Sequence, residues 1–204
     1  AHWQDEGYRC CVVIKQKYFV KFDDYETLWP QVEMQVHVYW YAESDTSAPC
    51  VPKLLHFFKS EGMGYTVMEY INLTFPPFLA EKVAENLNWL SRVAAPPDHV
   101  RTGPLGNGCA CHSLFKDFTV PLSFSSIEAL QQYLNKVCPC LYFLEYLCLC
   151  LVPPVEPLRI SDKLLIFTQS NMDLSNFGVD NEGKTVLLDF SNVGLLKQSS
   201  VVRD

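Results

Sequence analysis

Long hydrophobic runs are missing from this sequence: no apolar stretch approaches the roughly 20 residues that a membrane-spanning helix needs. The longest candidate, residues 141–155, is interrupted by Glu145 and closed by two prolines, so we interpret it as a buried helix. Residues 1–6 show no basic region followed by an apolar one, which predicts that no signal peptide is present, although a processed start stays open. We therefore expect a cytoplasmic protein with no membrane partner.

Positive charge is also scarce. The 204 residues hold 16 lysines and arginines against 23 aspartates and glutamates, which gives a formal net charge of −7 and a pI near 5.2. Because nucleic-acid phosphates bind to basic surfaces, this balance argues against nucleic acid as the main partner. An acidic surface is compatible with a cationic substrate.

The nine cysteines cannot all pair with one another, because their number is odd. Cys109 and Cys111 stand next to His112, which leaves a zinc site open as an alternative. Structural zinc sites, however, usually place two to four residues between their cysteines, whereas one residue separates these two. In a chain with no secretion signal, reduced and buried thiols are the favoured interpretation.

The N-terminal third of the chain predicts strands around one helix. With 49% hydrophobic residues, the chain can bury a core as one domain or one two-lobed unit. Residues 10–22 are rich in β-branched and aromatic side chains on both sides of a polar turn, which predicts a hairpin. Residues 27–44 show helical spacing of apolar side chains, with Pro30 near the first turn, where its missing N–H costs little. Residues 57–71 predict two more strands around a glycine-containing turn.

The rest of the chain predicts helices, followed by a polar loop and a hairpin. Apolar residues at helical spacing predict one helix over residues 79–94 and a second from about residue 127 to 151. A loop rich in amides and carboxylates then ends at Asn176. Two short apolar runs, residues 177–179 and 185–190, flank a polar turn with glycine at its end, which predicts a β-hairpin.

The segment from residue 167 to 194 combines these features in one order: a polar loop, a hairpin, and then Asp189 followed by Phe190 and a small residue. Kinases place two metal ligands at one cleft with this order. The segment resembles the catalytic and metal-binding region of the aminoglycoside phosphotransferase-like branch of the protein-kinase-like superfamily, and most of all the short fungal members of that branch. Their pattern is His-x-Asp-x-x-x-x-Asn, then a hairpin, then Asp-Phe-Gly.

The match to this pattern is incomplete at its general base. If Asn176 takes the place of the pattern's Asn and Asp189 that of its metal-binding Asp, counting back five residues puts Asn171 at the base position. The pattern's His becomes Gln169, and Ser191 replaces its glycine. An amide accepts a hydrogen bond but takes no proton near neutral pH, so the most demanding position of the pattern is altered.

The resemblance covers roughly residues 12–196 and implies an α+β, two-lobed fold. Residues 1–71 would form a small N-lobe of β-hairpins plus one helix, ending in the hinge between the lobes. Residues 72–204 would form a mainly helical C-lobe that carries the catalytic-type loop and the metal-binding hairpin. Only Gly7 precedes the first strand, so a glycine-rich phosphate loop is not evident.

The resemblance also implies that ATP and Mg²⁺ bind to this chain. The sequence alone allows Lys21 to be either a solvated edge residue or an inward-facing cation. The resemblance implies that Lys21 holds the nucleotide phosphates. Glu33 on the following helix would pair with Lys21, and Gln31 is the rival if the register differs. Asn176 and Asp189 would ligate Mg²⁺ through oxygen donors. Four consecutive residues would form the hinge that binds the adenine edge: Met68, Glu69, Tyr70 and Ile71.

Three functions follow from these expectations. The first is ATP-Mg-dependent phosphoryl transfer to a small-molecule hydroxyl, impaired by Asn171 unless the nearby Asp173 turns inward and supplies the missing carboxylate. The second is a catalytically inactive kinase-like protein that acts through nucleotide or partner binding. The third is a scaffold that binds no nucleotide, against which the presence of both Asn176 and Asp189 argues. The acceptor and the oligomeric state are left open.

Overall fold

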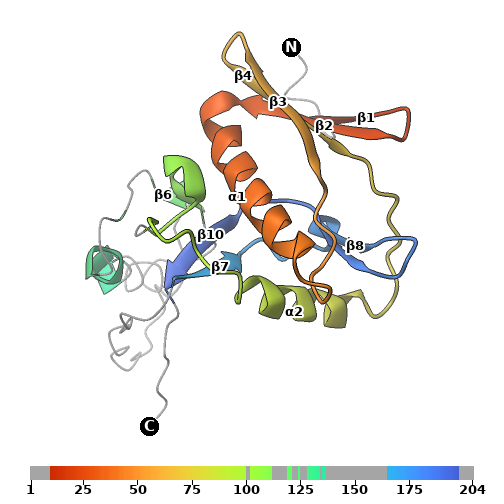
Figure 1. Cartoon of the computed structure of the whole chain (residues 1–204). Coiled ribbons are helices and arrows are strands. Elements are labelled where there is room, and N and C mark those ends of the chain that lie inside the picture. The colour runs from red at the N-terminus through yellow and green to blue at the C-terminus, as the bar shows by residue number, and fades with distance from the viewer. Residues whose placement is uncertain are drawn as a thin grey trace, which may run out of the picture.

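The computed structural model of the chain describes residues 10–99, 102–111, 119–120, 124, 128–133, 135–136 and 165–197. A four-stranded antiparallel sheet forms the N-terminal part, with its strands in the order β1-β2-β4-β3 (Figure 1). Its strands are β1 Cys11–Ile14, β2 Tyr18–Asp24, β3 Leu54–Ser60 and β4 Met63–Glu69.

Two tight turns set the register of this sheet. Lys15 and Gln16, with φ of 54° and 49°, join β1 to β2, and Glu61 and Gly62, with φ of 50° and 84°, join β3 to β4. Two successive central residues with positive φ give a hairpin turn the twist of its flanking strands. Both predicted hairpins are confirmed, with β3 beginning at Leu54.

Helix α1, Tyr25–Glu43, follows β2 directly. The Asp24 side chain caps it by accepting a hydrogen bond from the Glu26 N–H at 2.9 Å, which satisfies one of the unpaired donors of a helix N-terminus. The helix therefore begins two residues before the predicted range of 27–44. Pro30 consequently lies in the second turn rather than the first, and its missing N–H removes one backbone hydrogen bond from the helix.

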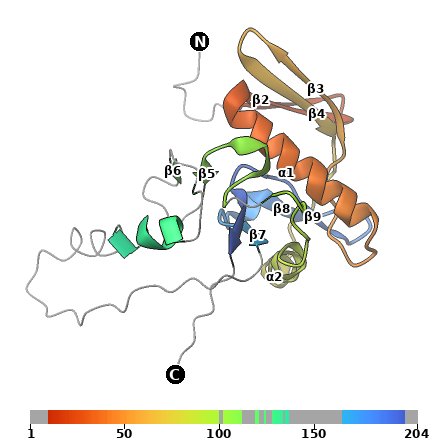
Figure 2. The ribbon, with the colours of Figure 1, turned by 60° about the vertical axis from the view of Figure 1, so that its left-hand side comes forward.

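Helix α1 connects the sheet to the C-terminal strands. Leu28 lies against the Gly64 backbone of β4. Further along the helix, Met34 and Val38 are fully buried in a core that also contains Phe167 and Leu195. Figure 2 shows α1 running past the four-stranded sheet at one end and past the C-terminal strands along its length. One helix thus fixes the position of both parts.

The helices predicted after the hinge are confirmed in part. Helix α2, Leu79–Leu90, lies within the predicted range of 79–94 and ends four residues earlier. Residues 128–133 and 135–136 are helical, as predicted. The remainder of that predicted helix, and the buried helix predicted over 141–155, lie outside the described residues. Three short elements lie between α2 and residue 128 along the described part of the chain: η1 Leu105–Asn107, β5 Ala110–Cys111 and β6 Thr119–Val120.

The C-terminal segment forms two small antiparallel sheets. Its elements are β7 Leu165–Gln169, η3 Leu174–Asn176, β8 Phe177–Val179, β9 Thr185–Leu187 and β10 Val193–Lys197. The predicted β8–β9 hairpin is confirmed, and Gly183 supplies the positive φ of its turn, 81°. Strand β10 returns beside β7, so the catalytic-type loop and the hairpin lie between two paired strands. Among the described residues, no helix has both the length and the apolar character that crossing a membrane requires.

Candidate functional site

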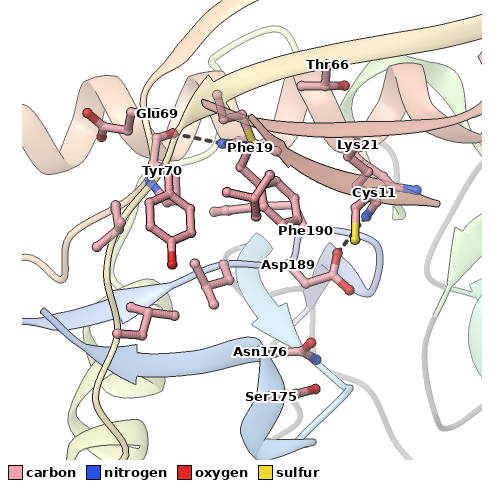
Figure 3. A pocket seen from close by; sticks show the side chains of 18 of the residues that line it. Cys11, Phe19, Lys21, Thr66, Glu69, Tyr70, Ser175, Asn176, Asp189 and Phe190 are labelled. Carbon is pink, nitrogen blue, oxygen red and sulfur yellow. Dashed lines mark hydrogen bonds and ion pairs between the residues drawn. The ribbon is translucent and has the colours of Figure 1, made fainter. Parts of the chain in front are cut away.

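A cavity of about 610 Å³ lies between the four-stranded sheet and the segment that surrounds the β8–β9 hairpin. This volume is within the range of small-molecule sites. Figure 3 shows Lys21, Asp189 and Asn176 at one end of the cavity, with Glu69 and Tyr70 at the other. These residues come from β2, the end of β4 and the residue after it, η3, and the stretch after β9, so the fold brings together side chains that are far apart in the sequence.

Lys21 faces this cavity and contacts two side chains. Its Nζ donates a hydrogen bond to Gln31 Oε1 at 2.7 Å and to Asp189 Oδ1 at 3.0 Å. The side chains of Lys21 and Asp189 are 25% and 28% exposed, so this ion pair is largely withdrawn from solvent. Of the two interpretations of Lys21, the inward-facing cation is the correct one.

The predicted partner of Lys21 on α1 was wrong in register. Gln31, the rival residue, contacts Lys21, whereas Glu33 does not line the cavity. A shift of two residues along a helix changes the direction of the side chain by about 200°, so Glu33 points to the other side of α1. There its Cγ lies 3.2 Å from the position that a Cβ on Gly106 would occupy. Lys21 is consequently paired on α1 with a neutral amide.

Asp189 is held by hydrogen bonds from two residues. Its Oδ1 accepts from Lys21 and, at 3.0 Å, from the Ser191 N–H, and its Oδ2 accepts from Ser191 Oγ at 2.8 Å. Burial raises the pKa of the Asp189 carboxyl, but the charge of Lys21 and the hydrogen bonds from Lys21 and Ser191 outweigh burial and lower that pKa below its ordinary value. Asp189 is therefore a carboxylate at neutral pH, and Ser191, at the glycine position of the pattern, helps to keep it ionised.

Asn176 is 7% exposed and lines the same cavity. Its Nδ2 donates to the backbone carbonyl of Asn171 at 3.3 Å, which directs the amide. One amide oxygen and one carboxylate, from Asn176 and Asp189, are hard donors of the kind that Mg²⁺ takes together with substrate phosphates. The donor set therefore fits a magnesium ion bound with a nucleotide.

Asn171, predicted at the general-base position, and Asp173, its predicted substitute, lie away from this cavity. Asn171 Oδ1 accepts a hydrogen bond from the Asp173 N–H at 3.1 Å. The Asp173 carboxylate accepts from the Ser175 N–H at 2.9 Å, caps η3 and is exposed. Neither Asn171 nor Asp173 is among the residues that line the cavity. The inward turn of Asp173 that a substitute base requires is not present.

Gln169 has a role that sequence reasoning did not assign. It is 7% exposed, and its Nε2 donates to the backbone carbonyl of Asp189 at 2.8 Å, while its Oε1 accepts from the Asn171 N–H at 3.4 Å. The side chain thus joins the catalytic-type loop to the Asp189 segment. The position of Gln169 at the pattern's His was the one feature of the sequence that could have indicated this.

The four predicted hinge residues line the far end of the cavity: Met68, Glu69, Tyr70 and Ile71. The backbone N–H groups of Glu69 and Tyr70 are used within the fold, donating to the carbonyls of Lys53 at 3.1 Å and Lys17 at 3.0 Å. The Ile71 N–H donates no backbone hydrogen bond to another described residue. Ile71 itself lines the cavity.

The zinc alternative falls partly outside the described residues, because His112 lies there and the Cys111 side chain is not described. Within the described residues, no group of three or more His, Cys, Asp or Glu side chains is arranged to hold a metal ion. The magnesium expectation does not depend on such a group, since nucleotide phosphates supply part of the coordination shell.

Comparisons with known proteins identify the fold. No protein-family model matches the sequence, and no curated protein matches it. Among solved structures, a thermostable mutant of aminoglycoside phosphotransferase APH(4)-Ia in ternary complex with AMP-PNP and hygromycin B matches with a TM-score of 0.50 and 11% identity, over 91% of this chain and 63% of that chain. The gentamicin complex of APH(2")-IIa gives a TM-score of 0.49 and 15% identity, over 92% and 62%.

This chain thus spans less than two thirds of the length of the solved structures that it matches. At these identities the likeness establishes the fold, and the sheet-rich N-terminal part with the cavity beneath it agrees with that result. The resemblance noted in residues 167–194 is confirmed at the level of the fold: the chain has the fold of the aminoglycoside phosphotransferase APH(4)-Ia.

Proposed function

We propose that the cavity binds ATP and that the chain is a kinase-like phosphotransferase acting on a hydroxyl of a small molecule. The observation that carries this proposal is the convergence of Lys21, Asp189 and Asn176 on one end of a cavity whose other end is the hinge. The AMP-PNP bound to the phosphotransferase of the same fold supports the choice of nucleotide.

Each part of the cavity has a function in this proposal. The adenine lies against the hinge, where the Ile71 N–H meets an acceptor of the ring. Lys21 contacts the phosphates, and Asn176 and Asp189 would hold Mg²⁺, which would supply neutralisation of charge on the transferred group. The acceptor oxygen forms a bond to the γ-phosphorus, the bond to the β–γ bridging oxygen breaks, and the hydroxyl proton leaves to solvent, since Asn171 cannot take it.

A second function, nucleotide binding without transfer, is favoured by one observation. Asp173, the carboxylate nearest in sequence to the base position, is exposed and caps η3 instead of facing the cavity. Removal of a general base lowers a rate by about 10²–10⁴. If the chain transfers phosphate, its turnover should therefore be slow. The first function predicts this slow turnover, and the second predicts none.

Calorimetric titration with ATP in the presence of Mg²⁺ tests nucleotide binding. We expect saturable binding that Lys21→Ala weakens by at least about tenfold, because a charge-assisted phosphate contact contributes about 1.5–3 kcal/mol. Lys184→Ala is the matched control: Lys184 is exposed, lies beside the β8–β9 turn and does not line the cavity. Absence of binding heat with the parent chain would contradict both proposed functions.

Turnover of ATP by Asn171→Asp separates the two functions. If Asn171 occupies the base position, the aspartate should raise turnover by two or more orders of magnitude. An unchanged rate would mean that residue 171 does not serve the acceptor, and nucleotide binding alone would be the better description. Asp173→Ala should leave turnover unchanged, because its carboxylate does not line the cavity.

A further inference from the structure

The charges at the phosphate end of the cavity cancel. Among the described residues that line the cavity, three carry a formal charge: Lys21, Glu69 and Asp189. The Glu69 carboxylate lies at the hinge, where its Oε1 accepts from the Lys53 N–H at 2.8 Å. Lys21 and Asp189 remain, one positive and one negative, in contact at 3.0 Å.

This balance arises because Gln31, which lines the cavity, is an amide at a position that is acidic in kinases. A kinase site combines a lysine with the glutamate of its helix, a catalytic aspartate and a metal-binding aspartate, and so has a formal charge of about −2. Gln31, 2.7 Å from Lys21, stands where the glutamate would pair with the lysine. Asn171, which spacing puts at the position of the catalytic aspartate, does not line the cavity and so does not enter this balance.

The missing carboxylate at position 31 changes the electrostatic interaction of the cavity with a nucleotide and with a divalent cation. Polyphosphate entering a site with excess negative charge is repelled, and a divalent cation relieves that repulsion. Here the phosphates meet Lys21 with no uncompensated carboxylate beside it. A divalent cation is attracted by a single carboxylate, and that carboxylate already accepts hydrogen bonds from Lys21 and Ser191.

We propose that this cavity binds a nucleoside di- or triphosphate without requiring a divalent cation, because Gln31 leaves Lys21 and Asp189 as a balanced pair. This inference rests on the proposed nucleotide site and adds to it that Lys21 supplies most of the phosphate neutralisation. Asn176 and Asp189 can still hold Mg²⁺ with the bound phosphates, but the ion adds little to affinity.

Titration of the parent chain with ADP and with ATP, once in excess Mg²⁺ and once in excess EDTA, tests the proposal by calorimetry. We expect the two dissociation constants of each nucleotide to differ by less than about tenfold. Binding that occurs in Mg²⁺ and disappears in EDTA would overturn this inference and leave the proposed function standing. Absence of binding in both conditions would overturn both.

Variants that restore or remove negative charge in the cavity test whether its charge balance causes the cation-independent binding. Gln31→Glu should weaken binding in EDTA by more than about tenfold while binding in Mg²⁺ is retained. Asn181→Asp, at an exposed turn outside the cavity, adds a charge of the same kind and should change neither constant. Asp189→Asn releases Lys21 and should strengthen binding in EDTA; weaker binding would mean that Asp189 acts through a required cation and would contradict the proposal.

Discussion

Gln169 shows how one neutral side chain can organise the site. It donates to the carbonyl of Asp189 and accepts from the N–H of Asn171, so a single residue holds the loop and the Asp189 segment together. Both hydrogen bonds are partly buried, and Gln169 itself is 7% exposed. Loss of such bonds lowers the stability of the fold, because the buried backbone groups are left without partners.

Gln169→Ala should therefore lower the free energy of unfolding by about 1–3 kcal/mol. Urea denaturation, followed by circular dichroism, measures this loss. Gln169→His retains a ring N–H donor and should lose less stability than the alanine variant. Gln132→Ala, on an exposed helical position, is the control and should stay within about 0.5 kcal/mol of the parent. Equal stability of Gln169→Ala and the control would contradict the assigned role.

The ion pair between Lys21 and Asp189 predicts a pH-dependent stability. Because the pKa of Asp189 is lowered in the folded chain, the pair stabilises the fold from the ordinary value of 3.8 up to neutral pH. That contribution is lost as the pH falls from 3.8 through the lower pKa of the folded state. Asp189→Asn should thus be about 1–2 kcal/mol less stable than the parent at pH 6.

Comparing the stability of the parent and Asp189→Asn at lower pH tests whether the ion pair causes the difference. Below pH 3.8 the gap in unfolding free energy between the parent and Asp189→Asn should narrow, because the protonated aspartate of the parent then resembles asparagine in charge. Denaturant titrations at a series of pH values measure the gap directly. A gap that is constant from pH 6 to pH 3 would mean that the ion pair does not stabilise the fold.

Single residues of the site differed in how far the sequence determined them. Asn176 and Asp189 were predictable because loop, hairpin and Asp-Phe keep a fixed spacing along the chain. The partner of Lys21 was not, because a shift of two residues on α1 turns a side chain to the other face and no local pattern distinguishes Gln31 from Glu33. The contact of Gln169 with Asp189 depends on two segments meeting in space, which spacing alone does not show.

Among the elements, the segment between α1 and β3 is attached to β9 by its backbone. The Cys50 N–H donates to the Thr185 carbonyl at 2.7 Å, and the Leu187 N–H donates to the Cys50 carbonyl at 3.0 Å. Burial, and to a lesser extent the charges of Glu69 and Asp180, raise the pKa of the Cys50 thiol to about 11. The thiolate is the reactive form, so only about one Cys50 in a thousand is reactive at pH 8.

Cys50 should therefore be alkylated at least about 100-fold more slowly than the exposed Cys109 when the folded chain is treated with iodoacetamide at pH 8. Peptide mapping by mass spectrometry at several times gives the rate for each cysteine. In denaturant the two rates should become similar, which shows that the fold causes the difference. Similar rates in the folded chain would indicate that the segment detaches from β9.

Elements with local signals were predictable, and elements that pair over long distances were not. The three hairpins follow from turns whose residues accept positive φ or end in glycine. Strands β7 and β10 were not predicted, because each is a short apolar run whose partner lies beyond the hairpin between them. Helix α1 began two residues early because the Asp24 cap outweighed the apolar periodicity that defined the prediction.

The molecule as a whole is held across the cavity by contacts between residues remote in sequence. Lys21 and Asp189 are 168 residues apart, and the Thr74 and Val179 backbones exchange hydrogen bonds of 2.8 and 3.0 Å, which attach the segment after the hinge to β8. A ligand that fills the cavity would touch both sides at once. Its binding should consequently restrict segments that the sequence places far apart.

Amide hydrogen exchange measures this restriction. On addition of ATP, peptides covering residues 66–72 and 186–191 should exchange more slowly together, because the ligand contacts the hinge and the Asp189 segment in one event. The β8–β9 turn at residues 180–184 is the internal control, since it does not line the cavity and should exchange at an unchanged rate. At a nucleotide concentration 100 times the dissociation constant the fold gains about 2.7 kcal/mol, enough for a clear effect. Slowing at the hinge alone would mean that the nucleotide does not reach Lys21 and Asp189, and Lys21→Ala should reduce the slowing in both segments equally.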